Sequence, residues 1–141
     1  MKHATSPADI RFRNDVESCT LAPDQFDHRA HVRLAYAYLT EHGPEEAAKR
    51  MRSALIAFLR HHGVDPSKYH ETITRAWIRA VRHFMEISPA ASSADAFIDA
   101  NPALLDARIM LTHYSAEVLF SQQARERFIE PDLDAIPDHG A

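Results

Sequence analysis

The chain has few of the features that stabilise secreted proteins or mark contacts with membranes and nucleic acids. It has one cysteine, Cys19, so no disulfide can form within the chain and a reducing cytoplasm is the expected compartment. No apolar run approaches the roughly 18 residues of a membrane-spanning helix, and the N-terminus lacks the apolar stretch of a signal peptide. Lys and Arg number 16 against 20 Asp and Glu, which gives a net charge of −4. We therefore expect no membrane and no nucleic acid among the partners.

Glycine is also scarce, with three residues in a chain of 141, whereas alanine occurs 23 times. This balance favours helix almost everywhere, because alanine has the highest helix propensity and glycine one of the lowest. Hydrophobic residues make up 45% of the chain and charged residues 26%, the composition of one globular domain with a single core.

Apolar residues recur at helical spacing, and no segment shows convincing strand alternation. We predict one helix from Asp9, a second from Asp24 or Asp27 to about His42 with Gly43 as the glycine after its end, a third from Pro44 to Gly63, and a fourth from about Lys68 to Ile87. Shorter helices are expected after Ser92 or Ser93, from Leu104 to Leu111, and after Ser115 and Ser121. The prediction is an all-α, single-domain helical bundle with short additional C-terminal helices, covering residues 9–133, with flexible tails at 1–8 and 134–141.

Histidine is abundant, with ten residues, and the histidines are the main candidates for a functional site. Six of them have ordinary interpretations, at helix ends, in the tails or on a solvated face: His3, His42, His61, His62, His83 and His139. The other four lie on or beside apolar stripes: His28, His31, His70 and His113. Of these, His28 and His31 are three residues apart, so they share one helix face.

Short connections make the three helices within residues 24–87 successive antiparallel neighbours. The first and the last of these helices are therefore parallel, and their N-terminal turns, with His28, His31 and His70, lie at the same end. The stretch from Ala94 to His113 is long enough, if mostly helical, to return the chain to that end. We therefore expect His113 to join the other three.

A helix N-terminus disfavours imidazolium, and neutral imidazole is the form that binds transition metals. Glu71 and Tyr114 are expected beside the cluster, either as partners that orient the ligating histidines or as acid–base groups. The sequence thus predicts a transition-metal site for Fe, Zn, Cu or Mn, in an oxidative or hydrolytic enzyme acting on a small molecule, with His28, His31, His70 and His113 as ligands. Haem is a further alternative, bound without covalent attachment because the chain has no CxxCH motif.

Two other functions fit the same residues. One is a metal-free small-molecule-binding or regulatory protein, whose histidines contact an anionic or aromatic ligand. The other is an interaction module that forms a homodimer through its broad apolar faces. Each histidine can also be a core residue that donates to a backbone carbonyl, and Glu71 can pair with Arg75 four residues on.

Five strings together resemble a family of short all-helical bacterial proteins of unassigned function: FDHRAHVRLAYAYL, GPEEAAKRMRSALIAFLRHHG, YHETITRAWIRAV, NPALLDARIMLTHYSAEVLFS and FIEPDL. The resemblance spans about residues 24–133. It implies an all-helical domain whose distinctive residues lie around His28, His31, residues 69–72 and residues 113–115. It implies no catalytic residues.

Overall fold

The computed structural model describes residues 2–137, and within that range it contains helices and connections but no β-strand. This confirms the predicted all-α, single-domain fold. The elements are α1 (Pro7–Glu17), η1 (Pro23–Gln25), α2 (His28–Glu41), α3 (Pro44–His61), η2 (Pro66–Lys68), α4 (Glu71–Ile87), α5 (Ala94–Ala100), η3 (Pro102–Leu105), η4 (Ala107–Thr112), α6 (Ala116–Leu119) and α7 (Gln122–Glu126), where η denotes a 3-10 helix.

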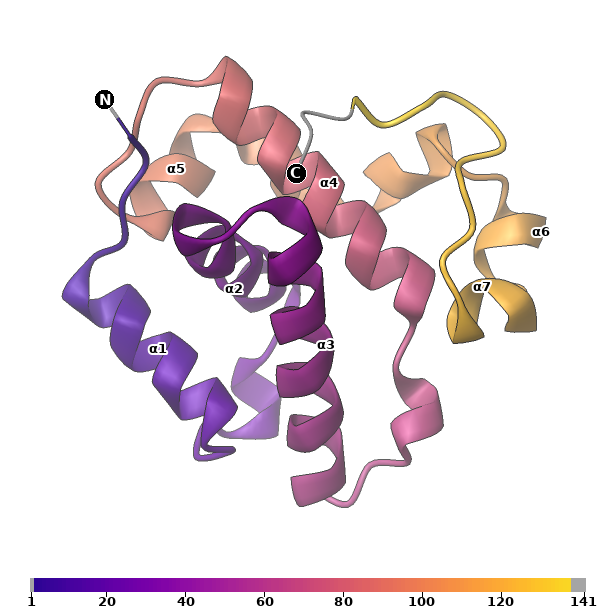
Figure 1. The fold of residues 1–141 in the computed structure, drawn as a ribbon, viewed down its shortest axis with the longest axis horizontal. Coiled ribbons are helices and arrows are strands. Elements are labelled where there is room, and N and C mark those ends of the chain that lie inside the picture. The colour runs from indigo at the N-terminus through magenta and orange to yellow at the C-terminus, as the bar shows by residue number, and fades with distance from the viewer. Residues whose placement is uncertain (1, 138–141) are drawn as a thin grey trace.

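The centre of the molecule is the packing of α2, α3 and α4 against one another, with α1 and α5 against α2 on one side (Figure 1). The helix α2 is buried through most of its length, and Leu34, Tyr36 and Tyr38 are among the largest fully buried side chains. The N-terminal turns of α2 and α4 both reach a cavity at the C-terminal end of α3. This arrangement was predicted from the short connections, and it positions the site described below.

Serine and aspartate caps explain where several helices begin. Ser6 accepts a hydrogen bond from the Asp9 backbone N–H while the Asp9 carboxylate accepts one from the Ser6 N–H, a capping box that begins α1 at Pro7. Asp27 caps α2 through the Ala30 N–H. Gly43 directly follows the end of α2, as predicted, but it is not a left-handed glycine. Its φ is −69° and it precedes α3, because a residue before proline is held extended.

Residues 2–8 are not the loose tail expected for 1–8. The His3 Nε2 donates to the Met85 carbonyl at 2.8 Å, and the His3 Nδ1 accepts from the Ala91 N–H at 3.1 Å. The Tyr36 hydroxyl donates to the Ala4 carbonyl at 2.8 Å. Sequence patterns could not reveal these contacts, because they join residues far apart in the chain.

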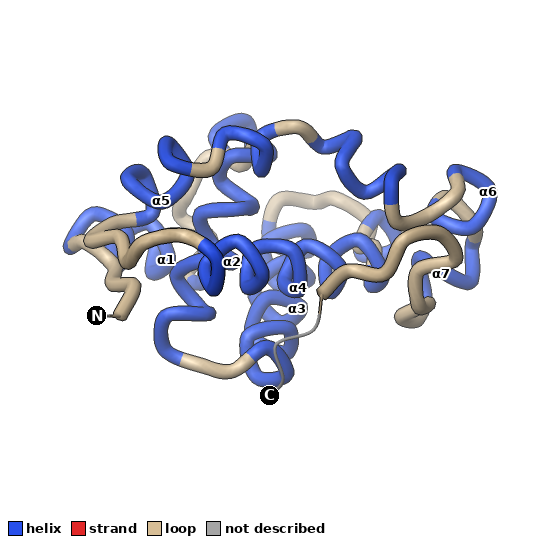
Figure 2. The backbone as a smooth tube through the Cα atoms, turned by 90° about the horizontal axis from the view of Figure 1, so that it is seen from above, coloured by secondary structure: helices blue, strands red, loops and turns tan. Residues whose placement is uncertain are grey.

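The C-terminal third is more broken than predicted. The segment from Leu104 to Leu111 belongs to two 3-10 helices, η3 and η4, separated at Asp106. The short helices α6 and α7 lie together at the end of the molecule opposite α1 and α5 in both views (Figures 1 and 2). Of the tail predicted at 134–141, Ile136 is buried in the core, and residues 138–141 lie outside the described range. No helix within residues 2–137 is long and apolar enough to cross a membrane.

Candidate functional site

A cavity of about 360 Å³ lies where the start of α2, the end of α3, η2 and the start of α4 come together. We call it the imidazole pocket, because three histidines from three different segments line it. Its walls are mostly apolar, and its size is within the range of small-molecule sites. The lining residues are Pro23, Phe26, His31, Leu55, Phe58, Leu59, His62, Val64, Lys68, Tyr69, His70 and Thr74.

His31 enters the pocket from the first turn of α2. Its ring meets the Phe26 ring edge-on, with 6.3 Å between centroids, and neither of its nitrogens makes a hydrogen bond within the described residues. Burial, and then the neighbouring His28, lower the pKa of His31 to about 4. The imidazole is therefore neutral near pH 7, as the sequence analysis expected for the helix N-terminus, although burial is the larger cause.

His62 lies on the opposite wall, directly after the last turn of α3. Its ring packs on the Phe58 ring at 4.5 Å between centroids. The helix is terminated by Gly63, whose φ of +72° is the left-handed conformation that favours glycine. The His62 Nε2 is buried and has no hydrogen-bond partner within the described residues. Such an atom is costly unless something binds it.

Sequence reasoning placed His62 among the ordinary histidines, and this is the main residue that it missed. A signal was present in the apolar face of α3: Met51, Leu55, Phe58 and His62 follow one another at intervals of four, three and four residues. That spacing keeps all four on one helix face. His61 next to it is exposed, so adjacent histidines have different surroundings.

His70 lines the same pocket as His31, which agrees with the prediction that the two lie at the same end of their helices. It is not in the first helical turn, however, because α4 begins at Glu71 and His70 is the cap. Its Nδ1 accepts from the Ile73 N–H at 3.1 Å and its Nε2 donates to the Leu119 carbonyl at 2.8 Å. Burial lowers the pKa of His70. With both nitrogens occupied, the ring has no lone pair to offer a metal.

His28 is half-buried beside the core and does not line the pocket. Its Nε2 donates to the Leu104 carbonyl at 2.9 Å, and its ring lies against Trp77 with 4.7 Å between centroids. The rings of His28 and His31 are stacked at 6.4 Å between centroids, as the three-residue spacing predicted.

His113 does not join the other histidines. Its Nδ1 donates to the Asp134 carbonyl at 2.7 Å, and it is not among the residues that line the pocket. The chain does return to the end where α2 and α4 begin, but there the Leu119 carbonyl, and not His113, contacts His70. The reason is that the stretch from Ala94 to His113 is broken at residues 101 and 106 instead of forming one long helix.

The two predicted acid–base residues have structural partners. The buried Tyr114 hydroxyl donates to the Ile129 carbonyl at 2.6 Å, and burial raises the pKa of Tyr114 to about 12. The Glu71 carboxylate accepts from the Tyr69 hydroxyl at 2.8 Å and forms ion pairs with Arg52 at 3.8 Å and Arg75 at 4.0 Å. The last pair is the one expected from the four-residue spacing. Neither Glu71 nor Tyr114 lines the pocket.

The described residues do not fit the four-histidine ligand set. Within residues 2–137, no group of three or more His, Cys, Asp or Glu side chains is arranged to hold a metal ion. His70 is saturated by hydrogen bonds and His113 lies elsewhere. Metal binding by this chain stays a prediction, with His28 and His31 as the pair that remains close.

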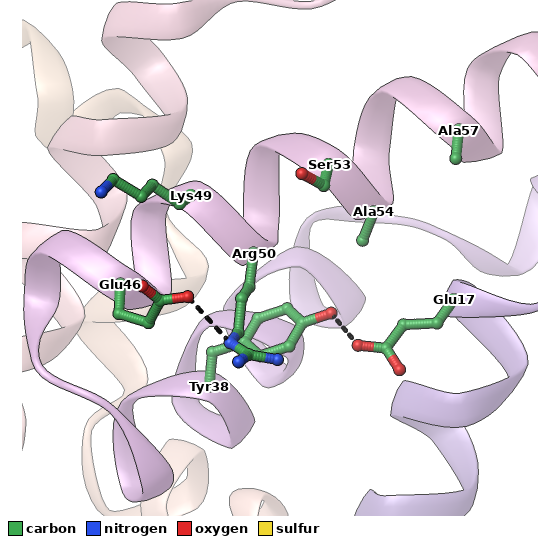
Figure 3. Close-up of a pocket in the computed structure, with 8 residues that line it drawn as sticks. All are labelled: Glu17, Tyr38, Glu46, Lys49, Arg50, Ser53, Ala54 and Ala57. Atoms are coloured by element: carbon green, nitrogen blue, oxygen red, sulfur yellow. Dashed lines mark hydrogen bonds and ion pairs between the residues drawn. The ribbon is translucent and has the colours of Figure 1, made fainter.

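A second hollow, of about 380 Å³, lies between α1 and α3 (Figure 3). The Tyr38 hydroxyl points at Glu17 and donates to its carboxylate at 2.6 Å, while Arg50 points toward Glu46 and donates at 3.1 Å. Burial, together with Glu17, raises the pKa of Tyr38. These polar groups already satisfy one another, in contrast to His31 and His62 in the imidazole pocket.

Comparison of the chain with family models, with curated proteins and with solved structures gives no match. The resemblance to a bacterial helical family therefore stays a prediction. The cytoplasmic location and the homodimer also stay predictions.

Proposed function

We propose that the protein binds a small organic molecule in the imidazole pocket, without a metal ion. The observation that carries this proposal is the buried Nε2 of His62, which has no partner within the described residues and belongs to a side chain that lines the cavity. A bound ligand would supply the missing hydrogen bond. This corresponds to the metal-free alternative of the sequence analysis.

The composition of the walls supports the proposal. Aromatic rings and leucines provide most of the surface, and a small number of polar atoms, on His31, His62 and Lys68, provide specificity. This combination is typical of small-molecule sites. Glu71 and Tyr114 do not line the pocket, so the proposal assigns them no chemical role.

The experiment compares two single substitutions on neighbouring residues of α3. Leu55 lines the imidazole pocket, whereas Ile56 lies on the other face of the same helix. Leu55→Trp fills the pocket, and Ile56→Trp adds the same side chain outside it. The probe is the neutral dye N-phenylnaphthylamine, whose fluorescence rises in an apolar site. We expect saturable binding by the wild type and by Ile56→Trp, and loss of binding in Leu55→Trp.

Equal fluorescence in all three proteins, or none in the wild type, contradicts the proposal. Circular dichroism and thermal melting of each variant separate a filled pocket from a damaged fold.

A transition-metal function is the second candidate, favoured by the stacked pair His28 and His31 and by the absence of any hydrogen bond to His31 within the described range. Two imidazoles would need solvent or substrate to complete the coordination of Fe, Zn, Cu or Mn. Elemental analysis of untagged protein tests it. Metal at near-unit stoichiometry that is lost in His31→Ala would favour this candidate, and a Soret band would indicate haem.

A further inference from the structure

We propose that the ligand of the imidazole pocket is a small aromatic carboxylate, whose carboxylate is bound by His62 and Lys68 and whose ring lies against Phe26 and Phe58. The inference rests on the proposed function and goes further, because it states the charge and the shape of the ligand. Three properties of the pocket support it.

The first property is the sign of its charge. The chain as a whole has a net charge of −4, yet no carboxylate is among the residues that line this pocket. The lining contains the Lys68 ammonium and three imidazoles. Two acidic residues beside the lining already have partners. Glu71 faces Arg52 and Arg75 and accepts from the Tyr69 hydroxyl, and Asp65, which also interacts with Lys68, accepts from the Ser67 N–H. An anion entering the pocket therefore meets a cation and N–H donors, and the lining itself contains no carboxylate.

The second property is the shape of the apolar wall, which is built from the faces and edges of rings. The Phe26 and Phe58 rings lie 5.5 Å apart between centroids at an angle of 42°. His31 meets Phe26 edge-on, and His62 lies against Phe58. Aromatic rings prefer offset or edge-to-face neighbours at these distances. A planar aromatic ligand extends this arrangement, whereas a branched aliphatic chain does not.

The third property is the unpartnered Nε2 of His62. With a proton on this nitrogen, the imidazole donates to a carboxylate oxygen, and a hydrogen bond to an ionised acceptor is stronger than one to a neutral acceptor. Lys68 is exposed in η2 and lines the rim. Its ammonium offsets part of the cost of moving a carboxylate out of water. A neutral alcohol gains only the weaker hydrogen bond.

The experiment measures displacement of N-phenylnaphthylamine by two molecules with the same ring system, naphthoate and naphthylmethanol. We expect naphthoate to bind the wild type at least about tenfold more tightly, a ratio that corresponds to one charge-assisted contact. Lys68→Met should reduce this preference severalfold, and His62→Phe should remove most of it. Lys49→Met is the matched control for Lys68→Met, because Lys49 is an exposed lysine on α3 that does not line the pocket, and it should leave the preference unchanged.

Lys68 is exposed, so Lys68→Met keeps the test valid even where His62→Phe fails to fold. Equal or tighter binding of naphthylmethanol overturns the carboxylate assignment while the pocket remains a ligand site. A naphthoate preference that survives both pocket substitutions also overturns it, since the carboxylate would then be bound elsewhere. Absence of dye binding in the wild type contradicts the proposed function itself, and the carboxylate assignment fails with it.

Discussion

The Nε2 of His70 donates a hydrogen bond to the backbone carbonyl of Leu119 at 2.8 Å. The other nitrogen of the same ring caps α4 by accepting from the Ile73 N–H. One imidazole thus caps the N-terminus of α4 and also links α6 to that end of α4. Because the carbonyl can only accept and the N–H can only donate, the ring is fixed as one neutral tautomer.

The substitution His70→Ala should therefore reduce stability rather than remove a ligand. Loss of the cap and of the bond to α6 predicts a decrease of about 1–3 kcal/mol in the free energy of unfolding, measured by urea denaturation. His70→Asn preserves a side-chain acceptor at the cap and should recover part of that loss. The exposed His61 is the control, and His61→Ala should change stability by less than about 0.5 kcal/mol. A stable His70→Ala protein would contradict the structural role.

Stability should fall as the pH is lowered from about 7 toward 4. The pKa of His31 is lowered to about 4 in the folded protein, against about 6.5 in the unfolded chain. Between these values the unfolded chain binds the proton and the folded protein does not, so protonation favours unfolding. The lowered pKa of His70 acts in the same direction below about 6.5.

Urea unfolding at several pH values between 7.5 and 4 measures this effect. His31 alone should lower the free energy of unfolding by up to about 3 kcal/mol over this range. Its neighbours in the pocket and on α2 that carry or can take up charge are His28, His62, His70 and Lys68. His31→Gln removes the titrating group and should flatten the slope. An unchanged slope in this variant would assign the pH dependence to other groups.

Asp9 should be the most sensitive acidic residue of the N-terminal half. Its side chain is buried, accepts from the Ser6 and Ala94 N–H groups and from Arg33, and is 3.0 Å from the Arg33 Nε. Burial by itself raises the pKa of Asp9, but these donors hold it below the ordinary value. The stability that Asp9 contributes is thus present above the unfolded pKa near 3.9 and is lost as the pH falls through the lower folded pKa.

Asp9→Asn replaces one acceptor oxygen with a donor that faces other donors. We expect a loss of about 2–4 kcal/mol in the free energy of unfolding at pH 7. Asp95→Asn is the control, because the Asp95 carboxylate pairs with Arg29 on the surface, where such pairs contribute less than about 1 kcal/mol. Similar losses in the two variants would show that the buried contacts of Asp9 add nothing.

Tyr114→Phe separates a structural hydroxyl from a reactive one. The hydroxyl donates to the Ile129 carbonyl at 2.6 Å and lies outside the imidazole pocket. Removing it leaves that carbonyl without this donor, so we predict a loss of about 1–2 kcal/mol with unchanged affinity for N-phenylnaphthylamine. A large change in dye affinity with little change in stability would contradict this structural role and indicate that Tyr114 belongs to the functional site.

Local sequence was sufficient for most of the helices. Asp27 and Ser93 cap the helices that follow them, and the apolar stripes of α2, α3 and α4 are readable because a buried helix face repeats every three or four residues. The short connections then determine that α2 and α4 are parallel neighbours. These facts predict that His28 and His31 share one helix face and that His31 and His70 lie at the same end, and the structure shows the first two rings stacked and the last two lining one cavity.

Only the tertiary structure decided what each imidazole does. The carbonyls that occupy His28 and His70 belong to Leu104 and Leu119, 76 and 49 residues further along the chain, and no periodic pattern encodes such partners. The spacing of the sequence places His62 on the apolar face of α3, but it does not reveal that the His62 Nε2 has no partner. A nitrogen is left without a partner because of how the surrounding elements pack. The local sequence thus predicts where each histidine lies on its helix. Whether its nitrogens are free depends on backbone groups that only folding brings near it.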